Sequence, residues 1–129
     1  MFNGVPTKGE HLKYYRGNFY KDQHIDEGWL IGRFRPGFRK TKKVEIKFKE
    51  FRKGRDTGHR RKYQKSAVEC TFILKGRISG EIDGRKVILR KGDYVVIPPG
   101  VPSNFPTKIL RKAEVLTVKV PSRKGDTKR

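Results

Sequence analysis

The chain has 129 residues and a formal net charge of +20, from 33 Lys and Arg against 13 Asp and Glu. This length suits one compact domain rather than two, and no apolar run is long enough for a transmembrane helix. The single cysteine, Cys70, excludes an internal disulfide and a cysteine-based zinc cluster, which favours a reducing, intracellular location. No signal-peptide core follows Met1, so a cytoplasmic protein without a membrane partner is expected.

The positive charge is concentrated in one segment. Residues 33–65 contain 15 Lys or Arg and three acids, a net charge of +12, whereas residues 1–32 balance at zero and residues 66–118 carry +4. A field this uneven attracts polyanions, and nucleic acid is the most common of them. The alternative is a charge that serves solubility or high temperature, but thermophilic surfaces usually add Glu together with Lys.

The first half of the chain predicts short strands separated by turns. Residues 1–28 are polar, with several glycines and tyrosines, which favours an irregular arm or an edge strand. Residues 29–32 predict a short buried strand, and residues 36–37 a turn. Apolar and charged side chains alternate over residues 44–51, which predicts a half-buried strand that bulges or ends at Phe51. A basic loop is expected over residues 52–62.

The second half shows clearer strand signals. Residues 70–74 predict an apolar strand that ends in a turn at Gly76. Asp83-Gly84, between residues 78–82 and 86–89, is the strongest signal, because this dipeptide is typical of a type I′ hairpin.

Three further segments complete this half. Residues 94–97 predict a buried strand, residues 102–107 a loop, and residues 114–120 an alternating strand. No stretch shows good helical periodicity. Many short strands at regular spacing predict an antiparallel sandwich or barrel.

Two segments of the second half resemble the sequence motifs of the cupin superfamily of small jelly-roll barrels. Residues 92–100 match the pattern G-x5-P-x-G of the second motif, and Ser103 stands where that motif often has a histidine. Residues 69–76 match the pattern E-x6-G that ends the first motif. The glycines and the proline of these motifs suit tight turns and a strand end in any barrel, whatever it binds.

The resemblance extends over residues 29–122 and implies an all-β, single-domain cupin-type jelly-roll β-barrel. Residues 1–28 then form an N-terminal arm or edge strand, and residues 123–129 a short basic tail. Cupins commonly dimerise by sheet packing, so the resemblance also implies a homodimer as one partner.

Cupin enzymes that resemble this pattern hold a metal ion with three histidines and one glutamate. The resemblance places Lys62 and Gln64 at two of the histidines and Ser103 at the third, so only Glu69 is retained. A protonated lysine has no lone pair to donate and repels a divalent cation. The sequence therefore predicts no metal and no other cofactor, and it assigns no catalytic residue.

The same four residues are expected to line a polar pocket at the barrel mouth. Lys62 and Glu69 are expected to form an ion pair there, beside Gln64 and Ser103. The pocket either binds an anionic or sugar-like ligand or is a relic filled by water and the ion pair. The relic is favoured, because no other sequence feature points to a ligand.

A metal-independent enzyme is a further alternative. Some cupin-like sugar isomerases and epimerases use His and Tyr acid/base pairs, and His59 with Tyr63 or Tyr94 offers those residue types. Their spacing does not place them together. Tyr94 and Cys70 lie in apolar runs, which predicts that both are core residues.

The basic segment is the feature on which the predicted function depends, because its arginines alternate with glycines and aromatic residues. The predicted nucleic-acid contacts are Arg33, Arg35, Arg39, Lys40, Lys42, Lys43, Arg55, Arg60 and Arg61. Phe34 and Phe38 either stack on unpaired bases or anchor this segment to the barrel. Residues 122–129 are expected to add a mobile basic contact.

These observations predict a non-enzymatic, metal-free barrel that binds the backbone of RNA or DNA through a basic surface. Such contacts are largely independent of sequence and strongly dependent on salt. One alternative is a small-molecule cupin with an anionic or sugar-like ligand. Another is a scaffold component of a nucleoprotein particle.

Overall fold

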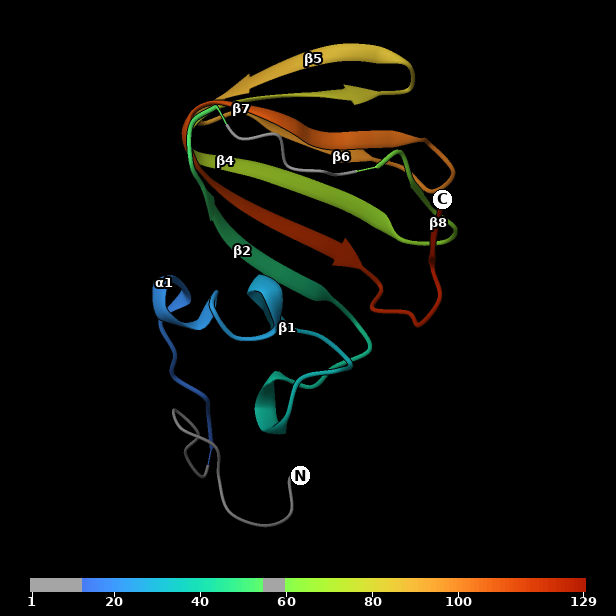
Figure 1. Cartoon of the computed structure of the whole chain (residues 1–129). Helices are drawn as coiled ribbons and strands as arrows, with labels where there is room; N and C mark the ends of the chain where they lie inside the picture. Colours follow the sequence, from blue (N-terminus) through green and yellow to red (C-terminus); the bar gives the residue numbers. More distant parts are fainter. Residues whose placement is uncertain (1–12, 55–59) are drawn as a thin grey trace.

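The computed structural model describes residues 13–54 and 60–129, which form an antiparallel β-structure with short helical turns at one end (Figure 1). One curved sheet has the strand order β1–β2–β7–β4–β5, with β6 also paired to β4, and β3 and β8 form a separate pair. The strands are β1 (Trp29–Ile31), β2 (Glu45–Phe51), β3 (Tyr63–Gln64), β4 (Val68–Ile82), β5 (Arg85–Arg90), β6 (Tyr94–Ile97), β7 (Ser103–Val120) and β8 (Thr127–Lys128). The helical turns are α1 (Phe19–Asp22), η1 (Asp26–Gly28) and η2 (Gly37–Arg39). The all-β class predicted from the sequence is therefore confirmed.

Two long strands, β4 and β7, organise the sheet. They pair with each other over most of their length, while β6 and β5 pair with successive parts of β4 and β2 pairs with the second part of β7. Figure 1 shows β5 at one end of the molecule and β1, β2 and α1 at the other, with β4 and β7 reaching both regions.

The turn predicted at Gly76 is wrong, because β4 continues through it. The pairing with β7 is irregular between Ile73 and Ile78, which marks a bulge. Gly76 has φ +85°, and a Cβ atom there would lie 2.1 Å from the carbonyl oxygen of Lys112. Glycine is required here by a bulge inside a strand rather than by a strand end.

The loop predicted over residues 102–107 is also wrong, because β7 begins at Ser103. Pro106 has no N–H to donate to a strand partner, which suggested a loop. The pairing steps from Ser79 with Lys108 to Glu81 with Asn104, so the proline lies where the ladder is already irregular. The hairpin at Asp83-Gly84 is confirmed, with φ +52° and +76° at its two central residues.

The main apolar core lies between β4, β5 and β7. Its buried members are Ile73, Ile78, Leu89, Phe105, Ile109, Ala113 and Val115. A different apolar contact forms on the outer side of β2, where Phe48 is fully buried beneath the rings of Phe19 and Tyr20, at centroid distances of 4.4 and 5.2 Å. Because side chains alternate along a strand, Lys47 and Lys49 face the opposite, inner side.

The strand predicted as buried at residues 94–97 is present as β6, but it is largely exposed. The side chains of Tyr94 and Val96 are 63% and 55% exposed, and only Ile97 is buried. Tyr94 stacks on Phe72 on the outer face, with centroids 5.6 Å apart. Tyr94 is therefore not a core residue, because a strand at an edge of this sheet presents one face to water.

The described part of the N-terminal arm packs against the sheet through a short helix that the sequence did not predict. Asn18 caps α1 by accepting a hydrogen bond from the backbone of Lys21. Gln23 and Glu50 exchange two hydrogen bonds of 2.6 and 2.8 Å, and the Tyr20 hydroxyl donates to Glu114 at 2.6 Å. None of the described helices is long and apolar enough to cross a membrane.

The C-terminal residues are attached as well. Strand β8 pairs with β3, and the carboxylate of Asp126 accepts hydrogen bonds from the backbone N–H groups of Ser66 and Ala67, both at 2.9 Å. Burial raises the pKa of Asp126, but the hydrogen bonds from Ser66 and Ala67 outweigh it and lower that pKa. This segment was expected to be a basic tail that adds a mobile contact, and in the structure its residues Thr127–Lys128 form one strand of a small sheet.

Candidate functional site

A cavity of about 60 Å³ opens on the inner face of β2, β4 and β7, and it is lined mainly by cationic and aromatic side chains. Its lysines are Lys47, Lys49, Lys62 and Lys119, and Glu69 is its single acid. Trp29, Phe51 and Phe105 supply aromatic walls. A cavity of this size has room for several waters or a small ligand. The excess of lysines over acids in its lining favours an anionic occupant.

The charged residues meet because of strand register. Lys119 on β7 is the partner of Glu69 on β4 and also of Glu45 on β2, and Lys47 is the partner of Thr117 two residues away. Partners directly across a sheet point to the same face. The alternation on β2 and the register of β7 therefore direct Lys47 and Lys119 into one space.

Glu69 is the centre of a small ion-pair network. It is 6% exposed, and its Oε1 lies 3.4 Å from Lys62 Nζ and 3.8 Å from Lys119 Nζ. The ion pair that the sequence predicted between Lys62 and Glu69 is present. Lys62 is fixed in turn by two backbone hydrogen bonds with Ser103, of 2.8 and 2.7 Å.

Lys47 and Lys49 have no carboxylate within ion-pair distance in the described part of the chain. Lys47 Nζ lies 5.1 Å from the ring centre of Trp29, and Lys119 Nζ lies 5.3 Å from the same ring. An indole face attracts ammonium groups, so it partly replaces the water that they have lost.

Burial is the main cause of the low pKa values of two of these lysines. Burial, assisted by repulsion from Lys49 and Lys62, lowers the pKa of Lys47 to about 8. Burial and then repulsion from Lys62 lower the pKa of Lys119, against the attraction of Glu69. The site therefore holds ammonium groups that are less stable in charged form than ordinary surface lysines.

Two of the four predicted pocket residues do not line this cavity. Gln64 is buried, but it accepts a hydrogen bond from Thr127 at 3.0 Å and borders a separate hollow with Asp126. Ser103 is also buried and holds Lys62 through the backbone. The structure thus places Lys62 and Glu69 at the cavity, whereas Gln64 and Ser103 do not line it.

Of the residues that line the cavity, the sequence reasoning placed only Lys62 and Glu69 there, and the cations that it missed are Lys47, Lys49 and Lys119. For Lys47 and Lys49 the signal was present in the alternation of residues 44–51, whose charged positions 45, 47 and 49 proved to be the inner ones. Hydrophobicity alone suggests the opposite orientation, because apolar side chains usually face the interior.

The donor set around Glu69 does not fit the metal that the resemblance to cupin enzymes implies. Ammonium groups of Lys62 and Lys119 occupy the surroundings of the one carboxylate. Within residues 13–54 and 60–129, no group of three or more His, Cys, Asp and Glu side chains is gathered where it could hold a metal ion. His24 is exposed, and His11 and His59 lie outside the described residues.

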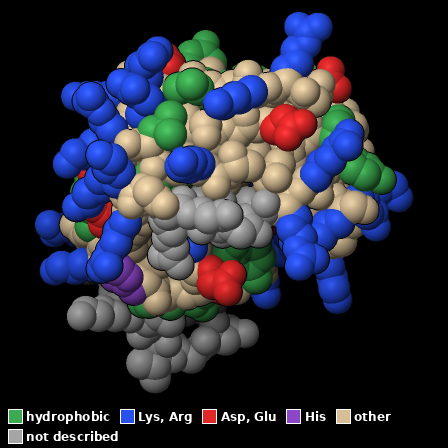
Figure 2. Space-filling model, turned by 45° about the horizontal axis from the view of Figure 1, so that its top comes forward, with side chains coloured by type: hydrophobic (Ala, Val, Ile, Leu, Met, Phe, Trp, Pro, Cys, Tyr) green, Lys and Arg blue, Asp and Glu red, His purple; other side chains and the backbone are tan. Residues whose placement is uncertain are grey.

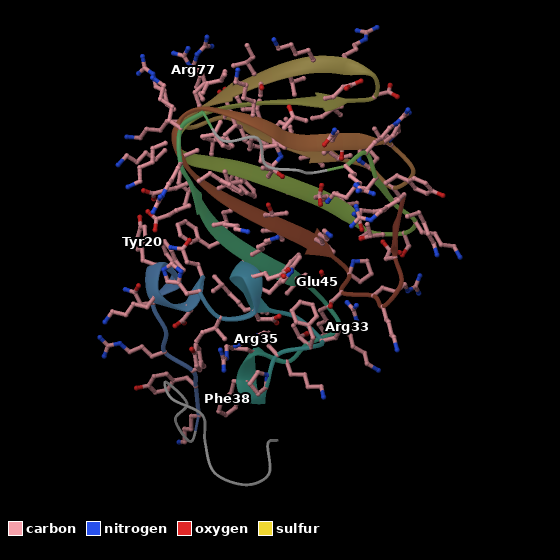
Figure 3. The ribbon with its side chains drawn as sticks, viewed as in Figure 1. Tyr20, Arg33, Arg35, Phe38, Glu45 and Arg77 are labelled. Carbon is pink, nitrogen blue, oxygen red and sulfur yellow. The ribbon has the colours of Figure 1, made fainter. Side chains whose placement is uncertain are left out.

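Three of the predicted nucleic-acid contacts are engaged within the protein. Arg33 forms an ion pair with Glu45, and Figure 3 shows these side chains directed toward each other. Arg35 lies 3.5 Å from Asp26, and Arg39 is 8% exposed. Arg33 and Arg35 thus link segments within residues 26–45, and the guanidinium of Arg39 lies 4.3 Å from the ring centre of Tyr15.

The remaining predicted contacts are at the surface where they are described. Lys40, Lys42, Lys43, Arg60 and Arg61 are exposed, and Arg55 lies outside the described residues. Phe34 and Phe38 are 41% and 44% exposed, and the ring of Phe34 packs edge-on against Trp29 with centroids 5.5 Å apart. Figure 2 shows Lys and Arg side chains at many points of one face, with few Asp or Glu between them.

A surface groove of about 400 Å³ lies beside β3 and β8. Arg61, Lys62, Tyr63 and Arg129 border it, and Tyr63 is 38% exposed. The groove combines cations with an accessible aromatic ring, and the exposed C-terminal residue takes part in it.

Comparison with known proteins identifies the fold. Residues 48–119 match the family model described as Cupin domain. A cupin protein from Bacteroides fragilis superposes with a TM-score of 0.56 at 21% identity, covering 65% of this chain and 70% of that one. KdgF from Halomonas sp. superposes with a TM-score of 0.55 at 17% identity, covering 65% and 74%.

A larger protein also contains the fold. Salicylate 1,2-dioxygenase from Pseudaminobacter salicylatoxidans superposes with a TM-score of 0.53 at 16% identity, over 62% of this chain but only 22% of that enzyme. No curated protein matches the chain by sequence. At these identities the likeness shows the fold, and it confirms the jelly-roll architecture predicted from the motifs.

Proposed function

Given that this chain belongs to the cupin domain family, we propose that its barrel binds a small organic anion in the lysine-lined cavity. The observation that carries the proposal is the charge of that cavity, where four lysines face one glutamate. Desolvated ammonium groups are costly unless they are paired. A bound carboxylate or phosphate beside Lys47 and Lys49 would pair with their ammonium groups and so offset the cost of their desolvation.

The walls of the cavity indicate what the anion carries. Trp29 and Phe51 offer flat apolar surfaces next to the lysines. Small-molecule sites commonly combine such walls with a few charged groups that fix orientation. An organic acid with a small apolar or planar body fits both features. Salicylate, in the name of the dioxygenase that shares the fold, is a compound of this kind.

Intrinsic fluorescence of Trp29, the chain's single tryptophan, offers a direct test of this proposal. We expect benzoate to change the emission in a saturable way and uncharged benzamide to leave it unchanged. Lys49→Met is expected to weaken benzoate binding about tenfold, which corresponds to about 1.4 kcal/mol. Glu69→Gln is expected to strengthen it, because a competing negative charge is removed.

The matched control is Lys86→Met, which removes an exposed lysine from the hairpin of β4 and β5. It tests whether a change of net charge alone alters affinity. Calorimetric titration provides an independent measurement, and circular dichroism verifies that each variant is folded. Equal responses to benzoate and benzamide, or equal loss in Lys49→Met and Lys86→Met, would contradict the proposal.

A second function, binding of single-stranded nucleic acid, is favoured by the groove beside β3 and β8. Its cations suit phosphates and the exposed ring of Tyr63 suits stacking on a base, and both contacts tolerate any sequence. The net charge of +20 supports the same partner. We therefore propose the groove as the contact surface for nucleic acid, in place of the basic segment from Arg33 to Arg61 that the sequence suggested. Arg61 belongs to both surfaces.

The homodimer that the resemblance implies stays a prediction.

Affinity for a mixed-sequence oligonucleotide, measured between low and physiological salt, tests this second function. Replacing both Arg61 and Arg129 with Ala is expected to flatten the salt dependence by about 1.4 in the slope of log K against log salt. Tyr63→Phe is expected to preserve binding and Tyr63→Ala to weaken it. Weak binding even at low salt, or unchanged slopes, would exclude the groove as the interface.

A further inference from the structure

We propose that Lys47 condenses with ligands that carry both a carbonyl group and a carboxylate, so that the barrel captures small oxo acids as an imine. This inference rests on the anion-binding function proposed above and specifies its ligand class. The observation behind it is that the lysines of one cavity differ in whether a carboxylate is paired with them. Lys62 and Lys119 are paired with a carboxylate, whereas Lys47 and Lys49 are not, and of these two Lys47 is the one that lies against the ring of Trp29.

The pairing of each lysine is the first step of the argument. Lys62 and Lys119 share the carboxylate of Glu69 at 3.4 and 3.8 Å. These two contacts restrain the positions of the ammonium groups of Lys62 and Lys119. Lys47 has no carboxylate within ion-pair distance among the described residues, so no such contact restrains its amine.

The position of Lys47 is the second step. It lies in the middle of β2, with Lys49 two residues further along the same face and Lys119 on the neighbouring strand. Its Nζ stands 5.1 Å from the ring centre of Trp29. A ligand whose carbonyl reaches Lys47 therefore has cations nearby for its acid group and an apolar wall beside its body.

The protonation state is the third step. Burial, then repulsion from Lys49, Lys62 and Lys119, lowers the pKa of Lys47 to about 8, with Glu27 opposing the shift. At pH 7 about a tenth of such amines are neutral, against well under a thousandth for an ordinary lysine. Only the neutral amine has the lone pair that attacks a carbonyl carbon.

The chemistry needs no further reagent. The neutral Nζ adds to the carbonyl carbon, and the carbonyl oxygen takes up a proton as the nitrogen loses one, which gives a carbinolamine. The hydroxyl then leaves as water together with the remaining proton of the nitrogen, which forms the C=N bond of the imine. One amine and one carbonyl give one imine and one water, with no change in oxidation state.

Reductive trapping in the intact 129-residue chain tests the inference. The protein is incubated with pyruvate and cyanoborohydride, and the adduct is located by peptide mapping. We expect modification at Lys47 to be at least tenfold faster than at Lys49 or at the exposed Lys86. Acetaldehyde, which has the carbonyl but no acid group, should label Lys47 with a clearly smaller preference than pyruvate does, because it gains from the neutral amine but not from the neighbouring cations, and lactate should slow the trapping by pyruvate.

The variants form a matched pair, because Lys47→Arg and Lys49→Arg both retain the positive charge on the same strand. The first is expected to abolish the selective adduct and the second to retain it. Wild-type mapping gives the answer even where a variant folds poorly. Labelling spread evenly over the lysines would overturn the inference.

Lactate separates this inference from the function on which it rests, because it has the acid group without the carbonyl. If lactate and pyruvate both perturb Trp29 fluorescence but pyruvate is not trapped at Lys47, the imine is refuted and anion binding stands. If neither compound, nor benzoate, perturbs the fluorescence, both proposals fail.

Discussion

Lys47 and Lys119 place their ammonium groups near a single indole, at 5.1 and 5.3 Å from its centre. Such contacts contribute about 1 kcal/mol each and do not restore the hydration that burial removes. The desolvation of Lys47 and Lys119 is therefore only partly compensated, and it lowers the stability of the folded protein. Strain or desolvation of this kind is most often found at binding and catalytic sites.

Replacement of Lys47 with Met is expected to stabilise the protein at pH 7. The pKa of Lys47 is about 8 in the folded chain and 10.5 for an ordinary lysine, so the charged form opposes folding. After allowance for the lost contact with Trp29, the gain is about 2 kcal/mol. Urea denaturation at fixed pH measures it.

The pH dependence of that difference follows from the same pKa values. Below pH 8 Lys47 is charged in both states and its full cost is present. From about pH 8 to 10.5 only the unfolded chain keeps the proton, so the wild type gains stability and the advantage of Lys47→Met declines. A variant that is less stable than the wild type at pH 7 would refute the assignment. Lys86→Met, which removes an exposed lysine, is the control for a change of net charge alone.

At this scale the sequence predicted the ion pair of Lys62 with Glu69 and missed Lys47 and Lys119. A period of two reveals that a strand has two faces, but not which face lies inward. In the structure Phe19 and Tyr20 of α1 pack on Phe48 from outside, a contact that the local sequence of β2 does not contain. A four-residue helix has too few residues to show periodicity.

At the scale of elements, β4 and β7 explain most of the differences between expectation and structure. Gly76 and Pro106 are residues that usually end strands, and here both lie within strands, at irregular pairings. The hairpin at Asp83-Gly84 was predictable because its backbone angles are set by two adjacent residues. A bulge depends on the partner strand, which the local sequence does not contain.

Gly76→Ala is expected to destabilise the protein by about 3 kcal/mol or more. Its added methyl group would meet backbone at 2.1 Å, and φ is +85°. Gly84→Ala is the matched control, since φ is +76° but no atom lies within 4 Å of the added Cβ. It is expected to cost about 1 kcal/mol. Equal losses in thermal or urea unfolding would show that the close approach is not decisive.

At the scale of the whole molecule, charge is the dominant property. The net charge of +20 is balanced locally at a few points, including Arg33 with Glu45 and Arg35 with Asp26. Elsewhere Lys and Arg face solvent with few acids nearby (Figure 2). The jelly roll was predictable because cupin motifs record turns that the barrel needs. The packing of the arm and the β3–β8 pair was not, because it depends on contacts distant in sequence.

Moderate salt is expected to raise the melting temperature by several degrees. Like charges repel in the compact state, and ions screen that repulsion over about 10 Å at 0.1 M. Scanning calorimetry in sodium chloride measures the effect. Low millimolar benzoate should add a further increase in the wild type and a smaller one in Lys49→Met. A melting temperature that falls with salt would mean that attractive pairs outweigh the repulsion.

The continuity of β4 and β7 also determines how the molecule comes apart. Strand β4 contributes Ile73 and Ile78 to the apolar core and Glu69 to the lysine-lined cavity, and β7 contributes Ile109 to the core and Lys119 to the cavity. Neither region can lose its hydrogen bonds without releasing a strand that the other uses. Amide hydrogens at the two ends of β4 should therefore exchange with similar protection, as parts of one cooperative unit. An anion that stabilises the cavity would then increase the protection of amide hydrogens throughout the sheet.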